Sequence, residues 1–131
     1  MLERLSRASA RLSGNVHGAL SNTCGIGFSD FVLLRAIHDT PGSRRVDLAA
    51  RVGLTASGVT RALLPLEKLG IVERVRDPRD ARASRARLTP AGETLLRDAT
   101  VIASEATASA LANRLDIAAR ADLLSLVERL G

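Results

Sequence analysis

The feature that most constrains the fold is a change of hydrophobic period near residue 71. Residues 45–70 carry apolar side chains at helical spacing, whereas residues 71–76 and 83–88 alternate between two faces. A period of two is typical of strands, because successive side chains of a strand point in opposite directions. The run DPRDA between the alternating segments, at residues 77–81, consists of turn-forming residues. The sequence therefore predicts helical structure followed by a β-hairpin.

Residues 45–70 are predicted to form two helices joined by a tight corner. Gly53 stands where the first helix ends with a positive φ, and Thr55 is a suitable N-cap for the second helix. A helix-turn-helix also needs a small residue at the helix crossing and aliphatic residues between the helices. The residues that meet these needs are Leu48, Ala49, Gly53, Leu54 and Val59. The expected inner face of the second helix consists of Val59, Ala62 or Leu63, Leu66 and Leu69.

Helices are also predicted on both sides of this unit. Residues 2–20 form an apolar stripe at helical spacing, which the run NTCGIG at residues 22–27 breaks. The next helix is expected to start at the capping residues Ser29 and Asp30 and to end at His38. Two more helices are expected to follow the N-cap residues Thr89 and Asp116.

The positive charge of the chain is concentrated in one segment. The formal net charge is +5, yet the segment from Arg44 to Arg87 alone carries +6 and the rest of the chain carries −1. Of the 19 basic residues 18 are arginines, whose guanidinium groups bind phosphates and base edges through two hydrogen bonds. Such a segment indicates a polyanionic partner, most often a nucleic acid, although charge alone also fits heparin-like or acidic protein partners.

The segment VTRALLPLEKLGIVERVRDPRDARASRARLTPAG, at residues 59–92, resembles the MarR (multiple antibiotic resistance regulator) family of transcription regulators. The matching features are an aliphatic residue and an arginine on the recognition helix, LEKLG at its end, DAR at the wing tip and LTPAG at the start of the next helix. Three positions depart from the family pattern, namely Arg44, Gly58 and Pro65.

The resemblance implies a fold that is mainly α with a small β-hairpin wing. It implies a winged helix-turn-helix at residues 28–89 and N- and C-terminal dimerisation helices at residues 1–22 and 90–131, all within one domain. It further implies a sequence-specific, ligand-responsive regulator, by default a repressor, that binds double-stranded DNA as a homodimer at a pseudo-palindromic operator. The alternative function is a winged-helix module for protein–protein interaction without operator binding.

In such a domain the first turns of the recognition helix enter the major groove, where Arg61 is able to bond a guanine edge. The residues expected to face the DNA from this helix are Ala56, Ser57, Thr60 and Arg61. At the wing tip, Arg82 is expected to enter the minor groove, with Asp80 orienting it through an ion pair and Arg79 as a substitute. Contacts with phosphates or solvent are expected for the strand residues Arg74, Arg76, Arg85 and Arg87.

The first and last helices carry apolar stripes, one over residues 2–20 and the other in the segment ADLLSLVERL. These stripes are predicted to form the homodimer interface, with an intramolecular core as the alternative. The family resemblance implies a small lipophilic or phenolic effector between the dimerisation helices and the DNA-binding lobe. The candidate lining residues are Val16, His17, Leu20, Phe31 and Arg35.

Other classes of function find little support in the sequence. It contains no Gly-rich phosphate loop, no nucleophile elbow and no paired His/acid constellation, so we expect no enzyme, no catalytic residues and no cofactor. One cysteine, Cys24, and two distant histidines predict neither a disulfide nor a metal site nor redox sensing. Charges in the first turns and the lack of a stretch of ~20 apolar residues predict a cytoplasmic protein without a signal peptide or membrane contact.

Overall fold

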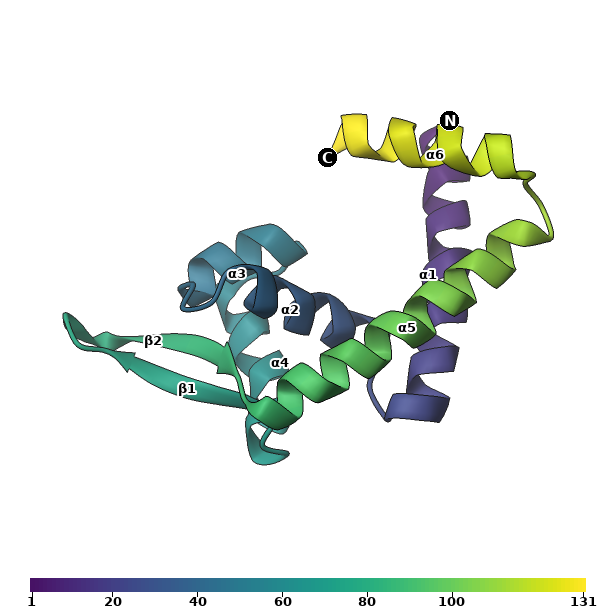
Figure 1. The fold of residues 1–131 in the computed structure, drawn as a ribbon. Coiled ribbons are helices and arrows are strands. Elements are labelled where there is room, and N and C mark those ends of the chain that lie inside the picture. Colours follow the sequence, from purple (N-terminus) through teal and green to yellow (C-terminus); the bar gives the residue numbers. More distant parts are fainter.

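The computed structural model describes residues 1–131, except for the side chains of Ala81 and Arg82. A long helix, α5, runs from the base of a hairpin past α1 to α6, while α2, α3, α4 and the hairpin gather at one end of it (Figure 1). We call α2, α3, α4 and the hairpin the winged lobe. The elements are, in chain order, α1 (Leu2–Cys24), α2 (Phe28–Asp39), α3 (Arg45–Val52), α4 (Ala56–Lys68), β1 (Val72–Asp77), β2 (Asp80–Leu88), α5 (Pro90–Ala112) and α6 (Ile117–Leu130).

The core lies where α1, α2 and α5 meet the corner between α3 and α4. Its largest fully buried side chains are Leu20, Leu33, Leu34, Ile37, Leu48, Val59 and Leu63. Each buried aliphatic side chain of this size contributes about 1.5–3 kcal/mol relative to an exposed one. One core therefore holds the helix-turn-helix against the helices on either side of it.

The corner between α3 and α4 has the predicted geometry. Gly53 adopts a left-handed conformation with φ 70°, and the Leu54 N–H donates to the Ala49 carbonyl at 2.9 Å. The hydroxyl of Thr55 accepts a hydrogen bond from the Gly58 N–H at 3.0 Å and so caps α4. The corner and both of its capping residues are confirmed, but the expectation that Leu54 lies between the helices is wrong, because its side chain is 46% exposed.

The inner face of α4 was predicted correctly in all but one position. Val59, Leu63 and Leu66 are buried, as expected, but Leu69 is 70% exposed. The prediction for Leu69 is wrong because α4 ends at Lys68, and Gly70 then turns the chain with φ 72°. Leu69 is therefore the C-cap residue of α4, and it keeps helical dihedrals of φ −79° and ψ −5° although its side chain lies outside the core.

The predicted hairpin is confirmed as an antiparallel pair. Val72 is paired with Leu88, and the register stays regular until Arg76 opposite Ser84. Between Arg76 and Asp77 the register shifts, so the last pair joins Asp77 to Asp80. The hairpin is therefore regular at its base, where it meets the core, and irregular near its tip.

The base of the hairpin is locked to α5 by the LTPAG segment. The hydroxyl of Thr89 accepts from the Gly92 N–H at 3.1 Å, which caps α5, and it also donates to the Gly70 carbonyl. A Cβ atom on Gly92 would overlap the Ile71 carbonyl oxygen. Glycine is therefore required at position 92, where the backbones of the wing base and of α5 come together.

The helix boundaries around residue 25 differ from the sequence expectation. α1 continues to Cys24 and ends at Gly25, which has φ 70°, so the predicted break at Asn22 comes too early. α2 starts at Phe28 with Gly27 as its N-cap, whereas Ser29 and Asp30 were expected to cap it. Asp30 occupies the third helical position, where its carboxylate accepts from the Gly27 N–H at 3.0 Å.

The N-cap of the last helix agrees with the sequence expectation. The Asp116 carboxylate accepts from the Ala119 N–H at 2.8 Å at the start of α6. α6 itself has no buried residue. Within the part of the chain that the structure describes, none of the helices combines the length and the apolar character that crossing a bilayer needs.

Candidate nucleic-acid interface

Helix α4 presents an exposed face opposite its buried one. Ala56, Ser57 and Arg61 are exposed, whereas Val59 and Leu63 point into the core. Ser57 and Arg61 are four residues apart and therefore lie next to each other on the helix surface. The structure thus brings three of the four predicted DNA-facing residues of this helix together, and their contact with DNA stays a prediction.

Thr60, the fourth predicted residue, is only half exposed and already has two partners. Its hydroxyl donates to the Ala56 carbonyl at 3.0 Å and accepts from Nη1 of Arg45 at 2.7 Å. Arg45, the first residue of α3, was missed by the sequence analysis. A cation at the first position of a helix is unfavourable for the helix dipole, and this conflict was the available signal that Arg45 has another partner.

The wing carries exposed charges near its turn. The side chains of Arg76, Arg79 and Asp80 are exposed. Figure 1 shows the hairpin extending beyond α3 and α4. The side chain of Arg82 lies outside the described residues, and so does its predicted ion pair with Asp80. Their roles at the wing tip stay predictions.

Arg85 differs from the other arginines of the wing. Its Nε and Nη2 donate to Oδ2 of Asp77 at 3.1 and 2.7 Å, and its Nη1 donates to the Gly42 carbonyl at 2.5 Å. The Arg79 backbone N–H and then the Arg85 guanidinium lower the pKa of Asp77. Arg85 therefore has partners within the protein, and its predicted contact with phosphate or solvent stays a prediction.

Two further wing arginines form surface ion pairs. Arg74 lies 3.3 Å from Glu67 of α4, and Arg87 lies 2.7 Å from Glu73 on the neighbouring strand. Exposed pairs of this kind contribute about 0–1 kcal/mol to stability, so both arginines remain able to exchange partners. Among the wing side chains that the structure describes, those of Arg76 and Arg79 make no ion pair.

The five candidate effector residues are distributed over several environments. Val16 and Phe31 line a pocket of about 490 Å³ beside α5, whereas Arg35 lines a neighbouring pocket of about 540 Å³. Leu20 is fully buried in the core. The ring of His17 is exposed, and its Nδ1 accepts from the Phe28 N–H at 3.2 Å at the start of α2.

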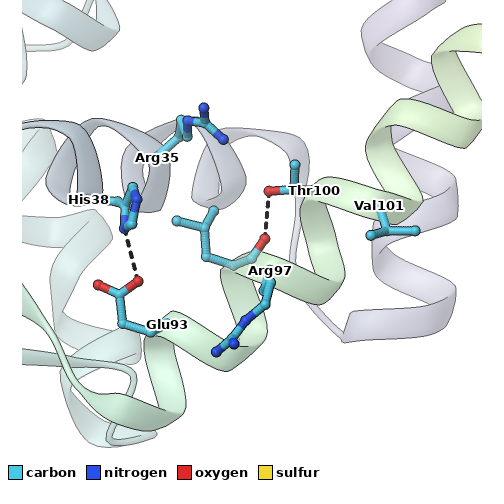
Figure 2. A pocket seen from close by; sticks show the side chains of 7 residues that line it. Arg35, His38, Glu93, Arg97, Thr100 and Val101 are labelled. Carbon is cyan, nitrogen blue, oxygen red and sulfur yellow. Dashed lines mark hydrogen bonds and ion pairs between the residues drawn. The ribbon is translucent and has the colours of Figure 1, made fainter.

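The two pockets adjoin each other along α2 and α5. Thr100 lines both of them, and its hydroxyl donates to the Leu96 carbonyl at 2.6 Å. Figure 2 shows His38 of α2 and Glu93 of α5 pointing toward each other across the second pocket, where they lie 2.9 Å apart. The α5 side of this groove was not predicted from the sequence, although Thr100 and Thr107 stand seven residues apart on α5 and both line the first pocket.

The two chain ends form an apolar surface away from the winged lobe. Figure 1 shows α6 crossing over the N-terminal end of α1. A pocket of about 490 Å³ between them is lined by Met1, Leu2, Leu5, Leu123, Leu126, Val127, Arg129 and Leu130. Most of these apolar side chains are more than half exposed in the single chain. The chain ends thus carry a cluster of exposed apolar side chains that a single chain leaves in contact with water.

Known proteins are similar to this chain in sequence and in fold. Residues 29–84 match the model of the MarR family. The HTH-type transcriptional repressor Rv2887 of Mycobacterium tuberculosis is 32% identical over 127 residues, which cover 97% of this chain and 90% of that protein.

Two solved structures extend the comparison to the fold. The MarR family protein Rv2887 of Mycobacterium tuberculosis, in complex with salicylic acid, superposes with a TM-score of 0.80 and 31% identity, covering 97% of this chain and 93% of that one. A MarR family transcriptional regulator of Streptomyces coelicolor, in complex with DNA, gives a TM-score of 0.83 and 25% identity, covering 98% and 82%. The chain belongs to the MarR family of winged helix-turn-helix, DNA-binding transcription regulators.

Proposed function

We propose that this regulator is a cytoplasmic homodimeric repressor that binds a pseudo-palindromic operator and responds to a small effector. The observation that carries the proposal is the two-sided character of α4. It buries Val59 and Leu63 in the core and exposes Ser57 and Arg61 on the lobe that also carries the arginine-rich wing. An α-helix fits the major groove, and an arginine there is able to bond O6 and N7 of guanine.

The terminal surface supports the homodimer. Leu126 and Val127 are each 54% exposed in the single chain, and Leu130 is 79% exposed. A second copy related by a two-fold axis covers these side chains and places two recognition helices on one face of the DNA. Half-sites then lie about one helical turn of DNA apart.

The groove along α2 and α5 supports a small lipophilic or phenolic effector. Its walls are mostly apolar, including Val16, Phe31 and Ala103, while Arg35 and Arg120 supply positive charge. The structure of the relative Rv2887 contains salicylic acid, a small phenolic molecule of this chemical class. A molecule between α2 and α5 contacts both the winged lobe and the helix that leads to the terminal surface. It is therefore placed to change the angle between the lobe and α5.

The DNA-binding proposal is tested by selection from a random-sequence duplex library, followed by fluorescence anisotropy on the enriched duplex. We expect an enriched motif with two-fold symmetry. Arg61→Ala should weaken binding to it by about 1–3 kcal/mol, because the variant loses a contact with a base edge. Arg114→Ala is the matched control, since it removes the same charge from an exposed residue near the terminal helices.

The alternative, a protein-binding module, makes the opposite prediction. A library in which no motif is enriched over the starting pool would reject operator binding. Equal losses for Arg61→Ala and Arg114→Ala would show that only net charge matters, which would reject base recognition by α4.

A further inference from the structure

The Asp77 carboxylate links three parts of the wing region. One oxygen, Oδ1, accepts from the Arg79 N–H in the turn at 2.9 Å, and the other, Oδ2, accepts from two nitrogens of Arg85. The third nitrogen of Arg85 donates to the Gly42 carbonyl, in the loop before α3. We call Asp77, Arg85 and the Gly42 carbonyl the wing clasp.

The position of the wing clasp suits a device that sets the direction of the hairpin. The strand pairing becomes irregular between Arg76 and Asp77, so the ladder alone does not fix the outer part of the wing. At the same level the backbone of Arg85 forms an isolated antiparallel bridge with Arg44, directly before α3. The clasp therefore acts where the strands leave their regular register and pass the start of α3.

Burial and charge set the wing clasp apart from the other ion pairs of the wing. The Asp77 side chain is 11% exposed, compared with 44% for Glu73, which pairs with Arg87. The guanidinium of Arg85 uses all three of its nitrogens in hydrogen bonds within the protein. Neighbouring groups favour the ionised carboxylate, because the Arg79 N–H and Arg85 both lower the pKa of Asp77.

We propose that the wing clasp positions the wing tip for DNA, so that Arg85 promotes operator binding through Asp77 and Gly42 and not through a phosphate. The inference rests on the proposed DNA interface. An isolated two-stranded hairpin is only marginally stable, so its direction depends on contacts with the rest of the lobe. Arg85 is thus a positioning residue, and the exposed arginines near the wing turn, Arg76 and Arg79, are the ones that meet DNA.

Asp77→Asn separates positioning from direct contact by the sign of its effect. If Arg85 bound a phosphate, neutralising Asp77 would remove a negative charge and release the guanidinium, so DNA binding would become tighter. If the clasp positions the wing, the asparagine loses the charged hydrogen bonds to Arg85 and binding becomes weaker. A weakening of about tenfold is expected, the size of one net charged hydrogen bond.

The test uses fluorescence anisotropy with full-length protein, on a duplex enriched from a random library by the wild type and on a scrambled duplex. Asp77→Asn and Arg85→Met should each weaken binding to the enriched duplex about tenfold and the double variant no further, because both remove the same clasp. Arg85→Lys should lose as much as Arg85→Met, since one ammonium group does not reproduce the fork between Asp77 and Gly42. Arg87→Met, an equal charge change on the same strand, should have a smaller effect.

A failure of the proposed DNA interface and a failure of the wing clasp give different results in this test. A wild type that enriches no duplex would reject the proposed DNA interface itself. A wild type that does enrich one, together with an Asp77→Asn variant that binds it equally or more tightly, would reject the wing clasp. Thermal unfolding of each variant completes the test, because a lower ratio of enriched to scrambled affinity with only a slight drop in the melting midpoint distinguishes positioning from a general loss of fold.

Discussion

The winged lobe and the terminal helices differ in how their apolar side chains are buried. The lobe places Leu34, Ile37 and Leu63 in a core that one chain completes by itself. α6 has no buried residue at all, and its Ile117 and Leu130 are each 79% exposed. The difference teaches that the lobe completes its core within one chain, whereas the terminal surface stays uncovered in a single chain and, on the proposed function, is covered by a second copy.

The largest effect is expected from a cavity in the lobe. Leu63→Ala should lower the free energy of unfolding by about 2–5 kcal/mol, because the side chain is 1% exposed and its removal leaves a hole in the core. Urea denaturation followed by circular dichroism, at one protein concentration, measures the loss. Leu69→Ala is the control, since this leucine is 70% exposed and should change stability by less than about 0.5 kcal/mol. Similar losses for both variants would contradict the assignment of the core.

The joint between the two regions comes next. Gly92→Ala should destabilise the protein by an amount near the upper end of about 1–3 kcal/mol, because the added Cβ meets a backbone carbonyl that has no side-chain freedom to move. Gly58→Ala, also within the first turn of a helix, provides the comparison. Its Cβ would lie 3.2 Å from Oγ1 of Thr55, which is able to adjust. Thermal unfolding should show a drop in the midpoint for Gly92→Ala that clearly exceeds that for Gly58→Ala.

A smaller effect, confined to assembly, is expected at the terminal surface. Leu126→Ala should weaken the dimer by about 1.5–3 kcal/mol, because each of the two copies loses the burial of roughly half a leucine side chain. Analytical ultracentrifugation should then show a dissociation constant about 10- to 150-fold higher. Leu69→Ala removes an equally large exposed side chain from the lobe and should leave the dimer unchanged. A purely monomeric wild type would reject the contrast between the two regions.

The smallest effect concerns pH and the wing. The pKa of Asp77 is lowered in the folded protein, so its ionised form stabilises the fold above the unfolded value of about 3.9, and this stabilisation is lost as the pH falls through the lowered pKa. Wild type should therefore melt slightly higher than Asp77→Asn at pH 7, and the gap should close in strong acid. Asp122→Asn, in exposed α6, provides the baseline. A gap that widens in acid would have the wrong sign for this assignment.

The sequence predicts the lobe well because local sequence signals mark the ends and the types of its elements. The change of period locates the hairpin, and Gly53 and Thr55 mark the corner without any knowledge of the tertiary structure. Leu69 was misplaced because the end of α4 depends on the turn at Gly70, which periodicity does not show.

The site is harder to predict because it depends on contacts between distant segments. Alternation places Arg85 and Arg87 on the same face of β2, yet only Arg85 reaches the carbonyl of Gly42, 43 residues earlier in the chain. The groove beside α5 likewise requires the packing of α2 against α5, so Thr100 was not recognised as a lining residue. Charge and period indicate which residues are available, whereas the packing decides which of them are engaged.

The length of α5 has a mechanical consequence. Its 23 residues form one uninterrupted helix between the base of the wing and the turn before α6, a span of about 34 Å at the usual rise per residue. If the α6 end is held in place, a tilt of about 6° displaces the other end by roughly 3–4 Å, which is close to the 3.4 Å spacing of successive base pairs. On the proposed function, α5 would act as a lever, because a slight rocking motion at one end moves the lobe at the other end by a distance close to one base-pair step.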